Sequence, residues 1–190
     1  MLREIHHSVL GLPSQRRFYD STARFKGFSG PVGSGKTYAL CHEALRAACR
    51  NPECTGLIGA PTYRHLKDVT IPIMVTILEE LNIPFQSREG AQPSMHLERQ
   101  RAQIIFRSLE KPNRLRGLNL AWFGIDELTY CRAEAWQVLC QTHPGSESQA
   151  SGGLRGLDTQ GFRLGIPAFH LAQTEAARLS GDHRRTDGKR

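Results

Sequence analysis

A glycine-rich segment, Gly30 to Thr37, constrains the fold of this chain more than any other feature. It reads Gly-Pro-Val-Gly-Ser-Gly-Lys-Thr and matches the pattern G-x-x-x-x-G-K-[ST] at every fixed position. An apolar run, residues 25–28, precedes the segment, and a helical pattern over residues 36–49 follows it. A strand, a glycine-rich loop and a helix in this order predict an α/β fold with a mainly parallel sheet flanked by helices.

The loop has the chemistry of a phosphate cradle. Its glycines let successive N–H groups point inward, and the positive end of the following helix faces the same cavity. Lys36 would bridge the β- and γ-phosphates, and the Thr37 hydroxyl would ligate Mg²⁺. A glycine turn that only caps a helix is the alternative, but such a turn needs neither the lysine nor the threonine. The pattern predicts a P-loop NTPase that binds ATP and Mg²⁺ through Gly30, Pro31, Val32, Gly33, Ser34, Gly35, Lys36 and Thr37.

Apolar runs and helical patterns alternate further along the chain, as in a parallel sheet with crossover helices. The expected strands are residues 25–28, 57–60, 104–107 and 120–125. The expected helices are residues 36–49, 71–81 and 132–139. Residues 95–97 and 103–106 are candidates for a hairpin across residues 98–101.

Two adjacent carboxylates, Asp126 and Glu127, follow the last of these strands. Asp126 would hold Mg²⁺ through water. The two-residue period of a strand would turn Glu127 the other way, where it would polarise a water for attack on the γ-phosphate. An Asp-Glu pair at the start of a helix is the alternative, because acidic side chains favour that end of the helix dipole.

Three further segments have candidate roles. Arg64, His65 and Lys67 follow the second strand, where they would contact a phosphate backbone or simply be solvated charges after a proline turn. Arg116 would reach a γ-phosphate in its own or a neighbouring subunit, or would only solvate its loop. The Gln15 amide would read both hydrogen-bonding edges of adenine. No histidine is assigned a ligand role.

Composition narrows the class of protein. The 25 Lys and Arg residues against 18 Asp and Glu give a net charge of +7, which favours a polyanionic partner. The five cysteines are scattered and form no C-x-x-C pair, so we expect neither zinc nor a disulfide framework. No apolar run could span a bilayer and no secretion signal is visible, so we expect a soluble, cytoplasmic protein without a membrane partner.

The character of the sequence changes after Cys140. The last 50 residues contain no Val, one Ile and eight Gly. We therefore expect an N-terminal segment over residues 1–24 that includes Gln15, an ATPase core over 25–140, and a disordered or out-of-frame tail over 141–190. The sheet would then be incomplete on its C-terminal side, without the strand that normally follows the Mg²⁺ aspartate. A bare sheet edge, marginal stability and aggregation would follow.

Several motifs in order resemble the large terminase subunit of tailed bacteriophages. They are Gln15-Arg16-Arg17-Phe18, the phosphate loop preceded by Phe25 to Ser29, Ala60-Pro61-Thr62-Tyr63, and Arg116-Gly117 ahead of Trp122 to Glu127. Order and spacing match over residues 12–139. The resemblance implies an ATPase of phage or prophage origin that pumps double-stranded DNA into a capsid. It also implies a homo-oligomeric ring on the phage portal, a small terminase subunit as partner, and a place in the bacterial cytoplasm.

The resemblance also implies a role for each matching residue. By it, Gln15 reads adenine, Lys36 and Thr37 hold phosphate and Mg²⁺, Asp126 holds the metal, Glu127 is the catalytic base and Arg116 is a finger acting on a neighbouring subunit. Members of the family carry a nuclease domain with clustered acids. The acids of the tail are too scattered for such a site, and no nuclease activity is expected.

A second departure is the Thr-Pro-x-Gly coupling segment, which the tail lacks. The codons of residues 157–167, read one base forward, permit a string that resembles this segment, so we hypothesise a frameshift near Cys140. Two other functions stay open at this point: an ATP-binding, nonmotor remnant that neither hydrolyses nor pumps, and a helicase-like or small-molecule P-loop enzyme.

Overall fold

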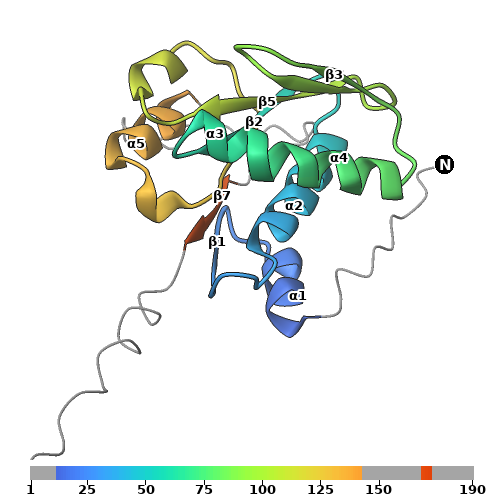
Figure 1. The fold of residues 1–190 in the computed structure, drawn as a ribbon, viewed down its shortest axis with the longest axis horizontal. Helices are drawn as coiled ribbons and strands as arrows, with labels where there is room; N and C mark the ends of the chain where they lie inside the picture. The colour runs from blue at the N-terminus through green and yellow to red at the C-terminus, as the bar shows by residue number, and fades with distance from the viewer. Residues whose placement is uncertain (1–11, 143–167, 173–190) are drawn as a thin grey trace, which may run out of the picture.

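A seven-stranded sheet forms the centre of the computed structural model, which describes residues 12–142 and 168–172 (Figure 1). Five neighbouring strands run parallel: β1 (Phe25–Ser29), β7 (Ala168–Ala172), β6 (Trp122–Ile125), β2 (Thr55–Ala60) and β5 (Ala102–Ser108). Two antiparallel strands complete the far edge: β4 (Ser94–Leu97) and β3 (Phe85–Arg88).

Helices cover both faces of this sheet because side chains alternate along buried strands. Ile58 and Phe106 face one core, which they share with α2 (Lys36–Arg50) and α4 (Ile71–Glu80). Leu57 and Ile105 face the other core, with α5 (Ala133–Gln141). The remaining helical elements are α1 (Pro13–Asp20), α3 (Tyr63–His65), the π turn η2 (Leu66–Thr70), and the 3-10 turns η3 (Pro112–Leu115) and η4 (Leu128–Tyr130). No helix in the described residues is long and apolar enough to cross a membrane.

The strands and helices expected from the sequence are present, with ends shifted by up to two residues. The hairpin is also confirmed: β4 pairs antiparallel with β5, and Leu97 lies opposite Ala102. The elements α1, β3, α3 and η2 were not predicted.

The strand β7 overturns the expectation that the sheet lacks a strand after Asp126. It lies between β1 and β6 and pairs in parallel with both. Two parallel strands that flank a gap offer unpaired N–H and C=O groups on both sides, and an extended five-residue segment satisfies both rows. The bare edge expected from a missing strand beside β6 is therefore not found, and β1 is the outermost strand on this side of the described sheet. The predicted frameshift and disordered tail concern residues that lie mostly outside the described ranges, and both stay predictions.

Candidate functional site

The phosphate loop joins β1 to α2 in the conformation that its glycines allow. Gly33 and Gly35 have φ angles of 80° and 74°, in the left-handed region that disfavours side chains. Gly35 is the N-cap of α2, and its carbonyl accepts the first helical hydrogen bond from the Ala39 N–H at 2.9 Å. The loop therefore ends directly at a helix N-terminus, where backbone N–H groups favour anions.

Lys36 provides a positive charge inside this loop. Its side chain is buried, with the residue 6% exposed, and its Nζ donates to the Pro31 carbonyl at 3.0 Å. Within the described part of the chain the amine forms no ion pair, and the Ser34 hydroxyl is buried without a hydrogen-bond partner. Burying an unpaired charge is unfavourable, so an anionic ligand would stabilise this arrangement. The loop thus fits a nucleotide phosphate.

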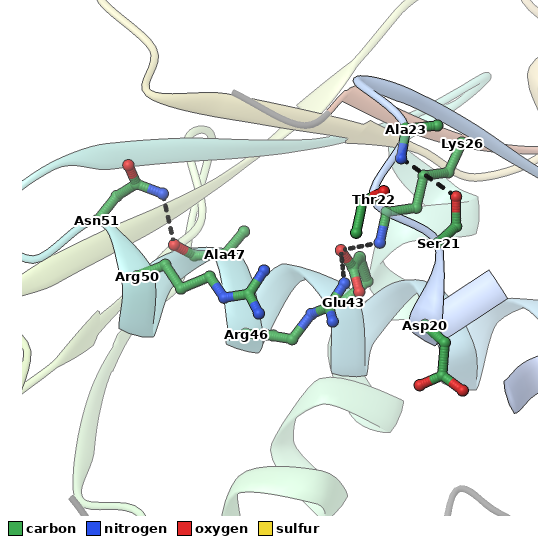
Figure 2. A pocket seen from close by; sticks show the side chains of 10 residues that line it. All are labelled: Asp20, Ser21, Thr22, Ala23, Lys26, Glu43, Arg46, Ala47, Arg50 and Asn51. Carbon is green, nitrogen blue, oxygen red and sulfur yellow. Dashed lines mark hydrogen bonds and ion pairs between the residues drawn. The ribbon is translucent and has the colours of Figure 1, made fainter. Parts of the chain in front are cut away.

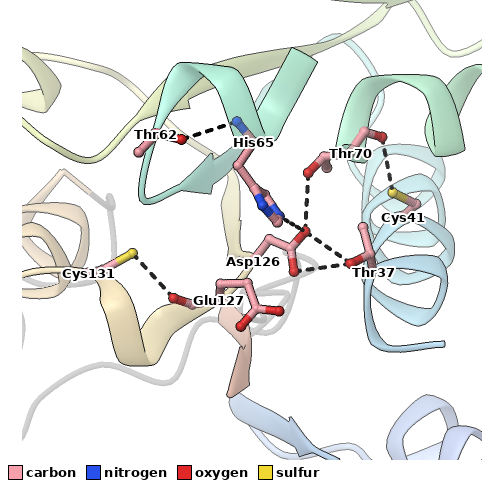
Figure 3. A network of polar contacts seen from close by, with 8 residues as sticks. All are labelled: Thr37, Cys41, Thr62, His65, Thr70, Asp126, Glu127 and Cys131. Atoms are coloured by element: carbon pink, nitrogen blue, oxygen red, sulfur yellow. Dashed lines mark hydrogen bonds and ion pairs between the residues drawn. The ribbon is translucent and has the colours of Figure 1, made fainter. Parts of the chain in front are cut away.

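Asp126 lies at the carboxyl end of β6 and is completely buried. Its N–H donates to the Gly59 carbonyl at 2.8 Å, which ties it to the end of β2. The Thr37 hydroxyl donates to the Asp126 carboxylate, at 3.1 Å from Oδ2 and 3.3 Å from Oδ1 (Figure 3). The structure thus brings Asp126 to the residue that follows Lys36, as the sequence predicted.

These oxygens suit Mg²⁺. The Thr37 hydroxyl and the Asp126 carboxylate are hard oxygen donors on adjoining elements. The described residues include no cluster of three or more His, Cys, Asp or Glu that would form an all-protein metal cage. Mg²⁺ is commonly bound by one or two side chains together with waters and phosphate oxygens, so this small donor set fits the ion.

His65 also contacts Asp126, a contact that the sequence analysis missed. The His65 Nε2 lies 3.0 Å from Oδ2 and must donate, because a carboxylate only accepts. This hydrogen bond raises the pKa of the imidazole, and partial burial opposes the shift. The Thr62 hydroxyl caps α3 by accepting from the His65 N–H, which fixes the start of the helix. Arg64, by contrast, pairs with Asp68 on the surface.

Glu127 adopts a left-handed conformation with φ 53° and ψ 47°. The strand β6 ends at Ile125, so the alternation of a strand does not orient Glu127 as we expected. The left-handed turn orients it instead, and its side chain lies beside Asp126, half-buried (Figure 3). A positive φ at a non-glycine residue is uncommon, and such residues are frequent at functional sites.

Gln15 reaches the phosphate loop from α1. Its residue is 7% exposed, and its Nε2 donates to the Gly35 carbonyl at 3.3 Å. The φ angle of Gly35 favours glycine, and a Cβ at this position would also push the Gln15 amide from its place. The structure therefore places Gln15 beside the loop, and its contact with adenine stays a prediction.

A buried ionic cluster holds α1 in this place (Figure 2). The Glu43 Oε1 on α2 accepts from the Lys26 amine at 2.7 Å and from the Arg46 guanidinium at 2.6 Å. Both cations also lie over aromatic rings of α1, Lys26 over Phe18 and Arg46 over Tyr19. Burial lowers the pKa of Lys26, and the bond to Glu43 opposes the shift. The cluster borders a cavity of about 300 Å³ and ties α1 to the helix that carries the loop.

Arg116 does not lie with the phosphate loop and Asp126 in the described residues. It is exposed at the end of η3, which packs against α5. In the described residues its side chain forms no hydrogen bond or ion pair with the phosphate loop or with Asp126. The structure thus gathers Gln15, the loop, Asp126 and Glu127, and leaves Arg116 apart.

Comparisons with known proteins agree with this arrangement. The family model described as "Terminase large subunit, T4likevirus-type, N-terminal" matches residues 28–142. No curated protein matches the chain.

Solved structures share the fold. The large terminase ATPase domain of Thermus phage P74-26 superposes with a TM-score of 0.59 and 19% identity over 84% of this chain and 63% of that domain. The large terminase of bacteriophage HK97 has a TM-score of 0.61 at 14% identity, over 87% of this chain and 33% of its own. A large terminase from a thermophilic bacteriophage, solved in complex with ATP-gamma-S, has a TM-score of 0.58 at 9% identity, over 84% of this chain and 37% of its own.

The chain therefore spans less than two thirds of the P74-26 domain and about a third of the HK97 protein. At these identities the superpositions establish the fold alone. The family model, however, matches more than half of the 190 residues. The chain belongs to the large terminase subunit family, in which it corresponds to the N-terminal domain.

Proposed function

We propose that this chain binds and hydrolyses ATP, and that hydrolysis drives double-stranded DNA into a phage capsid. The observation that carries the proposal is the hydrogen bond of the Thr37 hydroxyl to the Asp126 carboxylate. Thr37 follows Lys36, whose buried amine forms no ion pair with a carboxylate in the described residues. An acid at a strand end facing a Lys-Thr pair at a helix start is the arrangement that phosphoryl transfer requires. Family membership supports the DNA-packaging role, with portal, small subunit and a homo-oligomeric ring as partners.

Each residue then has one task. The loop N–H groups and Lys36 hold the phosphates, and Gln15 binds the adenine edge. Thr37 and Asp126 hold Mg²⁺, which neutralises phosphate charge when bound. Glu127 accepts a proton from the attacking water. Arg116, which is exposed, acts on the γ-phosphate of a neighbouring subunit.

ATP turnover of the Glu127→Gln variant tests this proposal. Loss of a general base lowers turnover by about 100-fold or more, while ATP affinity stays within about threefold, because the amide keeps the shape of the side chain. Glu134→Gln, an exposed change on α5, is the matched control and should hydrolyse ATP like the wild type. Double-stranded DNA should stimulate the wild type and the control alone.

The position of Arg116 favours one alternative, an ATP-binding protein that does not hydrolyse. In that case wild-type turnover would be no higher than that of Glu127→Gln, with or without DNA. That result would contradict the motor function and leave nucleotide binding standing.

A further inference from the structure

The helix that follows β2 contains a π turn at the point where it passes Asp126. The turn η2 covers Leu66–Thr70, and the Ile71 N–H bonds to the Leu66 carbonyl, five residues back. π turns are rare and occur frequently at functional sites. The side chains of His65, directly before the turn, and Thr70, its last residue, contact the same Asp126 oxygen, at 3.0 and 3.1 Å (Figure 3).

The widened turn explains how both side chains reach one atom. In an α-helix, five residues span about 1.4 turns, so residues 65 and 70 would point to different sides. A π turn, with its hydrogen bond between residues five apart, is wider and brings residues 65 and 70 closer to the same side. Figure 3 shows His65 and Thr70 pointing toward Asp126 from above, with Thr37 on α2 beside it.

Thr70 itself is fixed on several sides. It is completely buried, its hydroxyl donates to Asp126, and its carbonyl accepts a weak hydrogen bond from the Cys41 thiol on α2 at 3.8 Å. The Asp126 carboxylate is therefore held by hydroxyls from two helices and by an imidazole, and little freedom remains for it to rotate.

We propose that Thr70 and His65 are positioning residues for the metal-holding carboxylate, and that the π turn exists in this chain to present both to Asp126. Their proposed action is on Asp126, not on the nucleotide or the metal directly. They hold the Asp126 carboxylate in the orientation in which it accepts the hydrogen bond of the Thr37 hydroxyl. This inference rests on the proposed function, because it concerns the Mg²⁺ that accompanies the nucleotide. Outer partners of metal ligands typically change metal affinity by about 10- to 100-fold.

The test is a titration of the full chain with Mg²⁺ in the presence of ADP, monitored by calorimetry. ADP is the probe because no ATP is then hydrolysed during the measurement. Thr70→Val removes the hydroxyl and keeps the volume. We expect it to raise the Mg²⁺ concentration for half-maximal effect by about 10-fold, with ADP affinity in EDTA within about twofold of the wild type. Thr70→Ser should restore the wild-type titration, because it returns the hydroxyl. Thr76→Val is the matched control: it removes an exposed hydroxyl from α4 that bonds only to Pro72 in the described residues.

His65→Ala is a second variant that tests the inference independently if Thr70→Val folds poorly, because His65 is only half-buried. It should also raise the Mg²⁺ concentration for half-maximal effect. Wild-type Mg²⁺ dependence in both variants would overturn the inference while ADP binding, and with it the proposed function, stands. If the wild type binds ADP but Mg²⁺ has no effect, the inference is also overturned. Absence of ADP binding by the wild type, with or without Mg²⁺, would overturn the proposed function itself.

Discussion

At the scale of single residues, the site is a set of short contacts around one buried carboxylate. Asp126 has no exposed surface, and Thr37, His65 and Thr70 each donate a hydrogen bond to its carboxylate. Unsatisfied buried carboxylates are strongly destabilising, so these donors stabilise the fold as well as orienting the oxygens. The glycines of the neighbouring loop are equally constrained, because two of them have positive φ angles.

Gly35→Ala should weaken ADP binding by about 10-fold or more and destabilise the fold by about 1–2 kcal/mol. The new methyl would occupy a left-handed position and overlap the Gln15 amide, which would have to move away from the Gly35 carbonyl. Calorimetric titration with ADP and urea denaturation measure the two effects. Gly117→Ala is the matched control, since Gly117 has a φ of 81° but open space around it. It should lose similar stability and keep its ADP affinity; an equal loss of affinity in both variants would contradict the role of Gln15.

At the scale of elements, α2 carries residues of the phosphate site and also residues that hold α1 in place. Its first turn carries Lys36 and Thr37, and its second and third turns carry Glu43 and Arg46, which hold α1. The docking of α1 therefore depends on a charge cluster whose residues lie outside the phosphate loop, on β1 and further along α2 (Figure 2).

Glu43→Ala should destabilise the protein by about 3–5 kcal/mol, because it leaves the Lys26 amine buried without its acidic partner. The urea midpoint measures this loss. Lys26→Met should cost less, since Glu43 keeps Arg46 and the apolar chain fills the same space. Glu79→Ala, an exposed change on α4, serves as the control and should leave the midpoint within the equivalent of about 0.5 kcal/mol. Equal midpoints for Glu43→Ala and Glu79→Ala would show that the cluster contributes nothing.

Sequence reasoning succeeded at the elements whose signal is local. The phosphate loop, the apolar run before Asp126 and the helical pattern after Gly35 each predict their own structure. It failed for the contacts of His65 and Thr70 with Asp126. These contacts depend on a π turn, which the hydrophobic periodicity of the sequence does not predict. It also misjudged how Glu127 is oriented, since a left-handed residue follows β6 in place of a further strand residue. The Thr62 cap before His65 was a signal that would have placed a helix start at this edge of the sheet.

At the scale of the whole described molecule, the sheet places the site and also leaves an edge open. Parallel strands β1, β2 and β6 end on the same side, which is why Gly30, Ala60 and Asp126 lie at one edge of the sheet. In the described residues β1 pairs with β7 alone, so the strand that leads into the phosphate loop depends on a segment from the C-terminal fifth of the chain. Composition alone gave no reason to expect this, because the tail is poor in Val and Ile. The frameshift near Cys140 stays a prediction, which the nucleotide sequence tests.

The measurement that tests the central claim most directly is ATP affinity, by titration calorimetry in the presence of Mg²⁺, for the wild type and Lys36→Ala. A phosphate cradle predicts that the wild type binds one ATP per chain and that Lys36→Ala binds about 10- to 100-fold more weakly, because the variant loses a charge-assisted hydrogen bond. Lys111→Ala, an exposed change in another loop, should bind ATP like the wild type. Equal ATP affinity of the wild type and Lys36→Ala, or no ATP binding by either, would contradict the account.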